Sequence, residues 1–212
     1  MRYGMVIDLK RCIGCYGCQI FCKSENATPP GVQWSQVLFC ESGNYPNVKL
    51  TPLPVLCMHC GSPPCVNVCP TGASIRRPDG IVTISTAKCT GCGNCLLACP
   101  YGARHLCLKE KEYFPGQGLT PYEKISYRKG AGAVVGKCHF CLPRIKQGLE
   151  PACVQNCMAK ARHFGDLDDP GSNVSTLIRE RGVFQIHPCA CVESAVQETE
   201  PEMAPSVYYL AP

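Results

Sequence analysis

The sequence has few charged residues, few aromatic residues and no long hydrophobic run. Charged residues make up 17% of the 212 positions and aromatic residues 8%, with a single tryptophan. The low charge argues against an intrinsically disordered chain. No run approaches the roughly 18 apolar residues that a membrane-spanning helix needs, and the N-terminal segment has no apolar stretch typical of a secretory signal peptide. We therefore expect a folded chain without a direct membrane span.

Cysteine is the residue present in excess. The chain contains 20 cysteines, about 9% of its residues. When cysteine is left out, the apolar fraction falls from 45% to roughly 35%, which gives a thin core for this length. Something besides apolar burial must therefore hold the fold together. Disulfides, zinc sites and iron–sulfur clusters are the alternatives.

Four groups of four cysteines share a closely related spacing. Two groups read C-x2-C-x2-C-x3-C, one reads C-x2-C-x4-C-x3-C, and one reads C-x2-C-x11-C-x3-C. In chain order the groups are Cys12, Cys15, Cys18 and Cys22; Cys57, Cys60, Cys65 and Cys69; Cys89, Cys92, Cys95 and Cys99; and Cys138, Cys141, Cys153 and Cys157. The cysteines left over are Cys40, Cys107, Cys189 and Cys191.

This spacing favours [4Fe–4S] clusters over the other two uses of cysteine. The first three cysteines of a group converge on one cluster, and the fourth ligates a neighbouring cluster, as in bacterial two-cluster ferredoxins. Zinc sites instead use C-x2-C pairs separated by a longer span. Disulfides belong mainly to short exported chains. The sequence therefore predicts four [4Fe–4S] clusters.

The formal net charge of +5 does not by itself indicate nucleic-acid binding. Ligating thiolates and four oxidised cluster cores of about +2 each would bring the net charge to about −3. The excess of Lys and Arg then serves as counter-charge to the clusters. We expect no nucleic acid among the partners.

The second and third groups form an internal repeat. Each group ends in Cys-Pro and is followed by a Gly-Ala pair, at residues 72–73 and 102–103. Between them, two β-prone runs flank Pro78-Asp79-Gly80, which predicts a hairpin. Residues 56–104 are therefore predicted to form a compact ferredoxin-like unit that holds two clusters.

The first and fourth groups are predicted to form a second unit of the same kind. More than 110 residues separate the two groups, so this unit would be discontinuous, with residues 1–55 and 105–170 surrounding the inserted unit. The predicted fold class is α+β, with two ferredoxin-like two-cluster units, one inserted in the other, and long loops. Residues 109–136 are predicted to be a long basic loop, either solvated or docked on a partner.

Residues 171–212 are predicted to form a helix followed by an extended C-terminal arm. The helix would run from about Asn173 to Glu180, capped by Ser172 or Asn173 and ended by Gly182. The final twenty residues are acidic and interrupted by proline. We expect them to lie on a partner.

Two-cluster ferredoxin logic predicts that ligands cross over between the groups of one unit. Each cluster would take three cysteines from one group and the fourth from the paired group. No catalytic residue is predicted, and His59 and His139 are expected to pack near the clusters rather than to ligate them. The predicted sets are Cys12, Cys15, Cys18 with Cys157; Cys57, Cys60, Cys65 with Cys99; Cys89, Cys92, Cys95 with Cys69; and Cys138, Cys141, Cys153 with Cys22.

The cysteine groups resemble those of the four-cluster iron–sulfur subunits of the molybdopterin (dimethyl sulfoxide reductase) oxidoreductase family. The segments 5–15, 65–73, 151–153 and 164–170 are typical of that family. The short form looks most like the small subunits of arsenate, polysulfide, thiosulfate and tetrathionate reductases. Nitrate reductase relatives replace one cysteine of the third group by tryptophan. Cys92 is present here, so the resemblance implies four [4Fe–4S] clusters.

The resemblance implies a non-catalytic electron-transfer subunit. The implied partners are a large catalytic subunit that holds a molybdenum or tungsten bis-pterin cofactor and, in some relatives, a quinone-reactive membrane subunit. Co-export with the catalytic subunit would place the chain in the periplasm or on the outer face of the membrane, with a cytoplasmic complex as the alternative. Two other functions stay open: an electron carrier for a hydrogenase or a quinol-oxidising cytochrome system, and a cysteine-rich structural or zinc-binding module.

Overall fold

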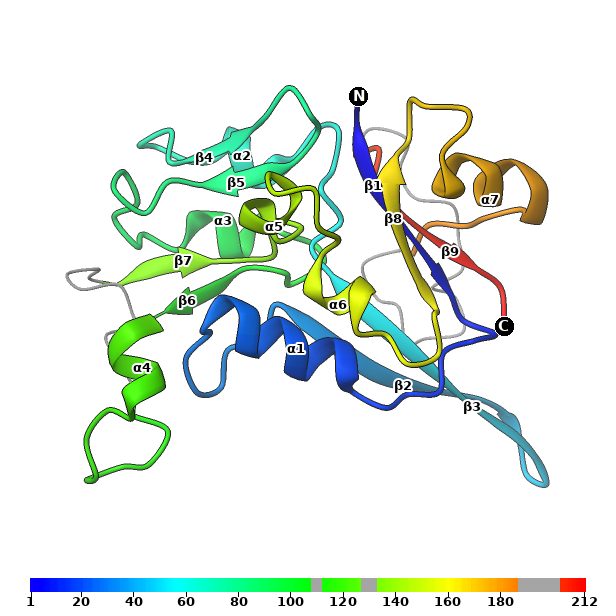
Figure 1. Ribbon diagram of the computed structural model, residues 1–212, viewed down its shortest axis with the longest axis horizontal. Helices are drawn as coiled ribbons and strands as arrows, with labels where there is room; N and C mark the ends of the chain where they lie inside the picture. Colours follow the sequence, from blue (N-terminus) through cyan, green and yellow to red (C-terminus); the bar gives the residue numbers. More distant parts are fainter. Residues whose placement is uncertain (108–111, 127–132, 187–202) are drawn as a thin grey trace.

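The computed structural model describes residues 1–107, 112–126, 133–186 and 203–212. Short helices and small sheets alternate along the chain and are joined by long loops (Figure 1). The strands are β1 Tyr3–Asp8, β2 Ser35–Asn44, β3 Asn47–Leu56, β4 Ser74–Arg76, β5 Val82–Ile84, β6 His105–Cys107, β7 Val134–Gly136, β8 Arg162–Asp166 and β9 Val207–Leu210. The helices are α1 Gly17–Asn26, α2 Pro64–Asn67, α3 Asn94–Leu97, α4 Pro121–Ser126, α5 Leu142–Ile145, α6 Ala152–Gln155 and α7 Asn173–Arg181. This mixture of α and β elements is the predicted class.

A three-stranded sheet in the order β8-β1-β9 ties distant parts of the chain together. Strand β1 pairs antiparallel with β8, Tyr3 lying opposite Asp166, and pairs parallel with β9, Met5 lying opposite Val207. Side chains alternate between the two faces of a strand. Met5 accordingly packs into the core that contains the buried cysteines, whereas the neighbouring Val6 packs with residues of α7 and β9.

The predicted helix near the C-terminus is confirmed. Helix α7 begins after Ser172, whose side-chain Oγ accepts a hydrogen bond from the Ser175 backbone N–H at 3.2 Å, and it ends at Gly182. Serine at this position satisfies a backbone donor that the first helical turn leaves unpaired. The fully buried Val174 packs against β1 and β9 from the outer side of the sheet.

The described residues at the end of the chain are extended, as predicted, and they pair with the chain's own strand β1. Residues 207–210 form β9, which is an edge strand of the chain's own core sheet. Val207 and Tyr209 are fully buried, and the Tyr209 hydroxyl donates to the Pro54 carbonyl at 2.9 Å. Residues 193–202, the acidic part of the predicted arm, lie outside the described residues. The β-prone run Val207–Leu210 that follows was not predicted to be a strand.

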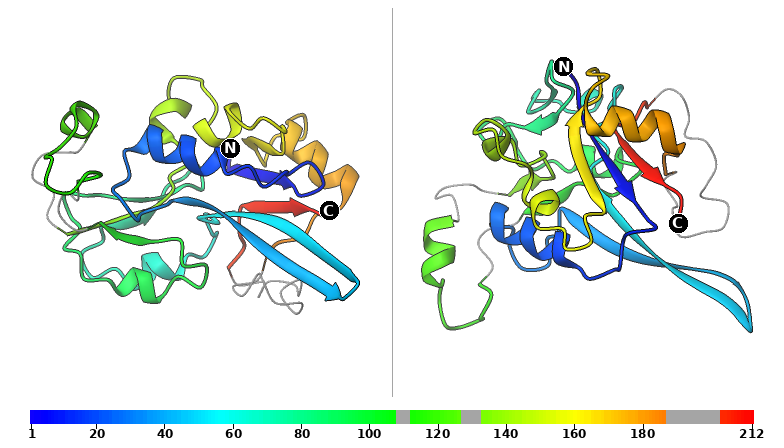
Figure 2. Two further views of the ribbon diagram at one scale, coloured as in Figure 1. Left: turned by 90° about the horizontal axis from the view of Figure 1, so that it is seen from below. Right: turned by 45° about the vertical axis from the view of Figure 1, so that its right-hand side comes forward.

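The two hairpins differ in length. The predicted hairpin around Pro78-Asp79-Gly80 is confirmed as β4 and β5, which pair antiparallel. A second hairpin pairs all ten residues of β2 with those of β3 and projects from the body of the molecule (Figure 2). Tyr45, at its tip, is 93% exposed. The sequence analysis did not identify this second hairpin.

Residues 109–136 are not one continuous loop, which corrects the prediction for this segment. Thr120 and Glu123 form a capping box at the start of α4, because the Glu123 backbone N–H donates to Thr120 Oγ1 at 3.3 Å and the Thr120 N–H donates to the Glu123 carboxylate at 2.6 Å. Val134–Gly136 forms β7 and pairs with β6. Residues 108–111 and 127–132 of the segment lie outside the described residues. None of the described helices is long and apolar enough to cross a membrane.

Each cysteine group begins with the same backbone turn. The residue before the second cysteine has a positive φ in all four groups: Gly14 (68°), His59 (45°), Gly91 (71°) and Phe140 (51°). Glycine adopts this conformation readily, whereas a residue with a side chain holds it at a cost of roughly 1 kcal/mol. The surrounding packing must therefore hold His59 and Phe140 in place. Both are almost completely buried, and their rings stack with centroids 3.8 Å apart.

Replacing Tyr209 with alanine should lower the melting temperature strongly. The change removes a fully buried ring from the core, and such truncations cost about 3–5 kcal/mol. Tyr209→Phe keeps the ring and should cost only about 1 kcal/mol, because it loses only the bond to the Pro54 carbonyl. Tyr45→Ala, the same truncation at the exposed hairpin tip, is the control and should leave the melting temperature unchanged. If Tyr209→Ala melts like this control, β9 is not part of the core.

Replacing Gly91 with alanine should destabilise the protein more than the same change at Gly93. Both glycines have a positive φ, of 71° and 81°, so both variants carry similar backbone strain. A Cβ on Gly91 would lie 2.3 Å from the carbonyl oxygen of Ala133, whereas a Cβ on Gly93 would meet nothing within 4 Å. We expect thermal unfolding to begin several degrees lower in Gly91→Ala than in Gly93→Ala. Equal melting temperatures would contradict the close packing of β7 on this loop.

Candidate iron–sulfur sites

The third cysteine of every group lies on a helix. Cys18 is on α1, Cys65 on α2, Cys95 on α3 and Cys153 on α6. The fourth cysteine follows one helical turn later. Helix α1 continues through Cys22, whereas α2, α3 and α6 each end two residues before their group's fourth cysteine. Because residues four apart lie on the same face of a helix, the third and fourth thiols of the first group point the same way.

One hollow in the structure is lined by the first three cysteines of the second group and the last cysteine of the third. Cys57, Cys60, Cys65 and Cys99 line it together with Tyr101 and Arg104. Burial and the nearby thiols of Cys57, Cys65 and Cys99 raise the pKa of Cys60 to about 12. Burial likewise raises the pKa of Tyr101, with Cys60 and Cys99 as further causes. The hollow therefore brings together sulfur atoms from two groups of the internal repeat.

The first and fourth groups meet where α1 packs beside α6. The Asn26 side-chain amide lies 3.6 Å from Cys22 Sγ and 3.9 Å from Cys141 Sγ. Burial raises the pKa of Cys22, and the thiols of Cys153 and Cys141 raise it further. Residues more than 110 positions apart in the sequence thus share one cluster of thiols.

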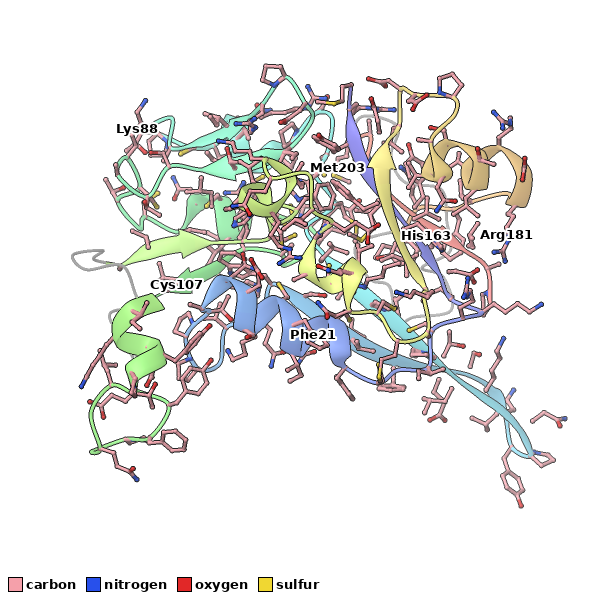
Figure 3. All side chains as sticks on the ribbon, in the orientation of Figure 1. Phe21, Lys88, Cys107, His163, Arg181 and Met203 are labelled. Carbon is pink, nitrogen blue, oxygen red and sulfur yellow. The ribbon has the colours of Figure 1, made fainter. Side chains whose placement is uncertain are left out.

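The loop that carries Cys12 is anchored by a buried carboxylate. Asp8 accepts hydrogen bonds from the backbone N–H groups of Lys10 at 3.0 Å and Arg11 at 3.3 Å, and it pairs with Arg181 at 2.6 Å. Its own carbonyl accepts from the Cys12 N–H at 3.1 Å. Figure 3 shows Arg181 at the end of the core sheet, beside this loop.

Cys12 has thiol neighbours from its own group and from the fourth group. Burial is the main reason that its pKa is raised, and the thiols of Cys18 and Cys157 add to the shift. Cys157 Sγ also accepts from the Ala161 backbone N–H at 3.3 Å. Cys15, by contrast, is exposed.

The two regions of thiols approach each other at Cys57 and Cys138. Burial raises the pKa of Cys138 well above its ordinary value, and Cys22, Cys153 and Cys57 are further causes. The stacked rings of His59 and Phe140 lie at the same junction. His59 Nδ1 accepts from the Val82 backbone N–H at 3.0 Å, and burial holds the pKa of this ring well below its ordinary value. His59 is therefore a neutral packing residue.

For the remaining predicted residues, the structure gives partners other than the thiols of a paired group. Cys69 Sγ accepts from the Ser74 backbone N–H and Cys89 Sγ from the Val135 N–H, each at 3.4 Å. Cys92 is exposed. His139 Nδ1 accepts from the Leu142 backbone N–H at 3.0 Å, and its ring packs edge-on against Trp34.

Two of the four cysteines outside the groups are described. Cys40 is on β2, opposite Thr51 in the long hairpin. Cys107 is on β6, near Lys23, at the opposite side of the molecule from Arg181 (Figure 3). Cys189 and Cys191 lie outside the described residues.

Three buried cations lie among the thiols, and the sequence analysis missed all of them. Arg104 and Arg162 are each 4% exposed and Lys137 is 3% exposed. Lys137 directs its amine to the backbone carbonyl of Cys138. The signal for Arg104 was present in the sequence, because it directly follows the Gly-Ala pair of the repeat. Basic residues are rarely buried without a partner of opposite charge.

The chemistry of these residues fits iron–sulfur clusters. The gathered donors are thiols, which are the ligands that Fe–S clusters use. Burying ionised thiolates together is unfavourable unless positive charge is placed among them, and iron supplies that charge. Arg104 donates to a thiol and Arg162 lies near two of them, which suits clusters whose net charge with their ligands is negative. Within the described residues, no three His, Cys, Asp or Glu side chains gather as they would around a single metal ion.

Comparison with known proteins agrees with this chemistry. The family model described as a 4Fe-4S dicluster domain matches residues 48–113 and again residues 106–167. The first match contains the second and third cysteine groups, and the second match contains the fourth group. The first group lies before both matches. Two dicluster domains correspond to four [4Fe–4S] clusters, which confirms the predicted cofactors. The match does not support the zinc-binding alternative.

Three relatives share most of their length with this chain. The arsenate respiratory reductase iron–sulfur subunit of a Shewanella species is 39% identical over 89% of this chain and 92% of its own. A selenate reductase subunit from Mesobacillus selenatarsenatis is 41% identical over 99% and 72%. A sulfite dehydrogenase subunit from Allochromatium vinosum is 39% identical over 88% and 78%. The chain therefore belongs to the 4Fe-4S dicluster family of iron–sulfur electron-transfer subunits.

Proposed function

We propose that this subunit relays electrons between a large molybdenum or tungsten bis-pterin catalytic subunit and a further carrier, such as a quinone-reactive membrane subunit. The named relatives support a reductase or dehydrogenase complex and do not favour a hydrogenase or cytochrome carrier. When bound, the clusters supply one-electron carriage. The chain's own residues hold them in place, exclude water and set the charge around them. Location outside the cytoplasm, through co-export with the catalytic subunit, stays a prediction.

The observation that carries this proposal is a graded exposure along the series of thiol groups. Cys57 and Cys138 belong to one buried core cluster, and the stacked rings of His59 and Phe140 come from the second and fourth groups. We therefore place these two groups in the middle of the series. The first three cysteines of both middle groups are buried. The exposed cysteines are Cys15 in the first group and Cys92 in the third. Buried middle sites with an exposed site at each end suit a relay that exchanges electrons with a different partner at either end.

We also propose that the ligands cross over between paired groups, in the sets predicted from the sequence. The grouping of Cys22 with Cys141 and Cys153 supports the exchange between the first and fourth groups. The Cys157 thiol, which helps to raise the pKa of Cys12, supports the reciprocal exchange. The hollow that contains Cys99 beside Cys57, Cys60 and Cys65 supports the exchange in the internal repeat. The set that includes Cys69 rests on the symmetry of that repeat.

The nested arrangement of two ferredoxin-like units is proposed on related grounds. Strands β1 and β8 pair across more than 150 residues, and α1 packs beside α6. The segment 56–104, with its own hairpin and two cysteine groups, lies between these elements in the sequence. A discontinuous outer unit of residues 1–55 and 105–170 accounts for both contacts.

The relay is tested by purifying the protein anaerobically from its native host. We expect about sixteen iron and sixteen sulfide per chain, with visible absorption that dithionite bleaches. The chain should copurify with a much larger pterin-containing subunit, and dithionite-reduced chain should pass electrons to that subunit. The isolated chain should turn over no substrate, because the proposal assigns substrate turnover to the larger subunit. A complete set of clusters that exchanges no electrons with any pterin enzyme would contradict the proposed function.

The crossover of ligands is tested by paired substitutions read by electron paramagnetic resonance. Cys157→Ala should perturb the same cluster signal as Cys15→Ala, because both residues belong to one predicted set. Cys22→Ala should instead perturb the signal that Cys141→Ala perturbs. Cys40→Ser and Cys107→Ser serve as controls and should leave every signal and the iron content unchanged. If Cys22 and Cys15 affect one signal while Cys157 and Cys141 affect another, each group ligates its own cluster and the crossover is wrong.

A further inference from the structure

Two buried arginines occupy matching positions in the two halves of the cysteine pattern. Arg104 stands five residues after Cys99, and Arg162 stands five residues after Cys157. Each therefore follows the last cysteine of its group at the same distance. Both side chains are almost completely buried, at 4% exposure. The match is not a product of the Cys-Pro-x-Gly-Ala repeat alone, because the fourth group lacks that sequence.

Arg104 lies close to a cysteine from each group of the internal repeat. Its Nη2 donates to Cys65 Sγ at 2.9 Å and to Ser74 Oγ at 2.7 Å. The Cys95 thiol is near enough to act on the guanidinium electrostatically. Cys65 and Cys95 are the third cysteines of their groups. Ser74 stands five residues after Cys69, so it is the repeat counterpart of Arg104 and holds it in place.

Arg162 repeats this arrangement in the other pair of groups. Its Nη2 donates to Ser35 Oγ at 3.0 Å, and the thiols of Cys18 and Cys153 are near enough to act on the guanidinium electrostatically. Cys153 and Cys18 are again the third cysteines of their groups. Each arginine is thus held by one serine hydroxyl and has the third cysteines of two groups nearby.

Neither arginine is neutralised by a carboxylate. In the part of the chain that the structure describes, the ion pairs of arginine side chains involve other arginines, such as Arg77 and Arg181. Nε and Nη1 of Arg104 and Nη1 of Arg162 are buried without a hydrogen-bond partner. An isolated charge is costly to bury, so the negative charge that balances each guanidinium comes from the sulfur side.

We propose that Arg104 and Arg162 set the reduction potentials of the clusters, each acting as a fixed positive charge shared by the two clusters of its unit. The inference rests on the proposed function only in that the third cysteines of paired groups ligate different clusters, and it does not require the crossover. Reduction adds one electron to a cluster. A nearby positive charge in a low-dielectric interior stabilises the reduced form and raises the potential. Because each guanidinium lies near thiols from both groups of a unit, it acts on both clusters together.

The experiment is a redox titration of the intact complex, monitored by electron paramagnetic resonance. In Arg104→Met, the equilibrium constant for reduction should fall at least tenfold for both clusters of the 57–99 region, which is 59 mV for a one-electron couple. The other two clusters should change less than threefold. Arg162→Met should show the opposite pattern. Arg104→Lys and Arg162→Lys retain the charge and should restore the potentials to within threefold of the unaltered protein.

Arg77→Met is the matched control, because it removes an arginine from the same region that is paired with Asp79 on the β4–β5 hairpin. It should leave all four potentials unchanged. A full iron content with unchanged potentials in Arg104→Met would overturn the inference while leaving the relay intact. Shifts confined to one cluster, or spread over all four, would overturn it too. If the methionine variants lose iron, the lysine variants decide: unchanged potentials support the inference, and a tenfold shift overturns it. Failure of the relay itself would appear already in the unaltered complex, as clusters that do not exchange electrons with the catalytic subunit.

Discussion

Ionised thiols that are buried side by side repel one another, and the rest of this structure depends on positive charge being placed among them. Burial and neighbouring thiols raise the pKa of Cys22, Cys60 and Cys138, so in the absence of iron these groups favour the protonated form. Ligation removes those protons and supplies the missing charge. The apolar core is thin, and many of its buried members are the cysteines themselves. Cluster ligation therefore replaces much of the cohesion that apolar side chains provide in other proteins of this length.

The protein contributes the parts that ligation cannot. The sheet of β8, β1 and β9 fixes where the chain enters and leaves the region of the first and fourth groups. Asp8 links this sheet to the Cys12 loop, and the capped helix α7 covers its outer face. Arg104 and Arg162 supply charge that stays the same in every oxidation state. Different residues thus position the cysteines and supply the positive charge around them. The positive charge lies near the third cysteine of each group.

Local patterns predicted the local structure well. Cysteine spacing identified the four groups and the family, Pro78-Asp79-Gly80 identified a hairpin, and Ser172 identified the start of α7. The capping box of Thr120 and Glu123 was equally local but was obscured by the glycines and basic residues around it. Long-range features were harder to predict, because nothing in Val207–Leu210 specifies pairing with a strand near residue 5. Nor does the sequence around Arg162 show that its side chain is buried against Cys153. The ligand sets, the nesting of the two units and the location of the complex stay predictions.

The pairing of β1 has a consequence for the order in which the molecule is built. Strand β1 is synthesised well before its two neighbours, because β8 and β9 are made only after residue 160 and after residue 205. Both edges of this strand therefore stay without their native partners until those later segments have been synthesised. The segment 56–104 contains its hairpin and two cysteine groups within a short span, so it has the local contacts needed to fold earlier. Final assembly of the core sheet is then a late step, completed only once the chain has been synthesised as far as β9.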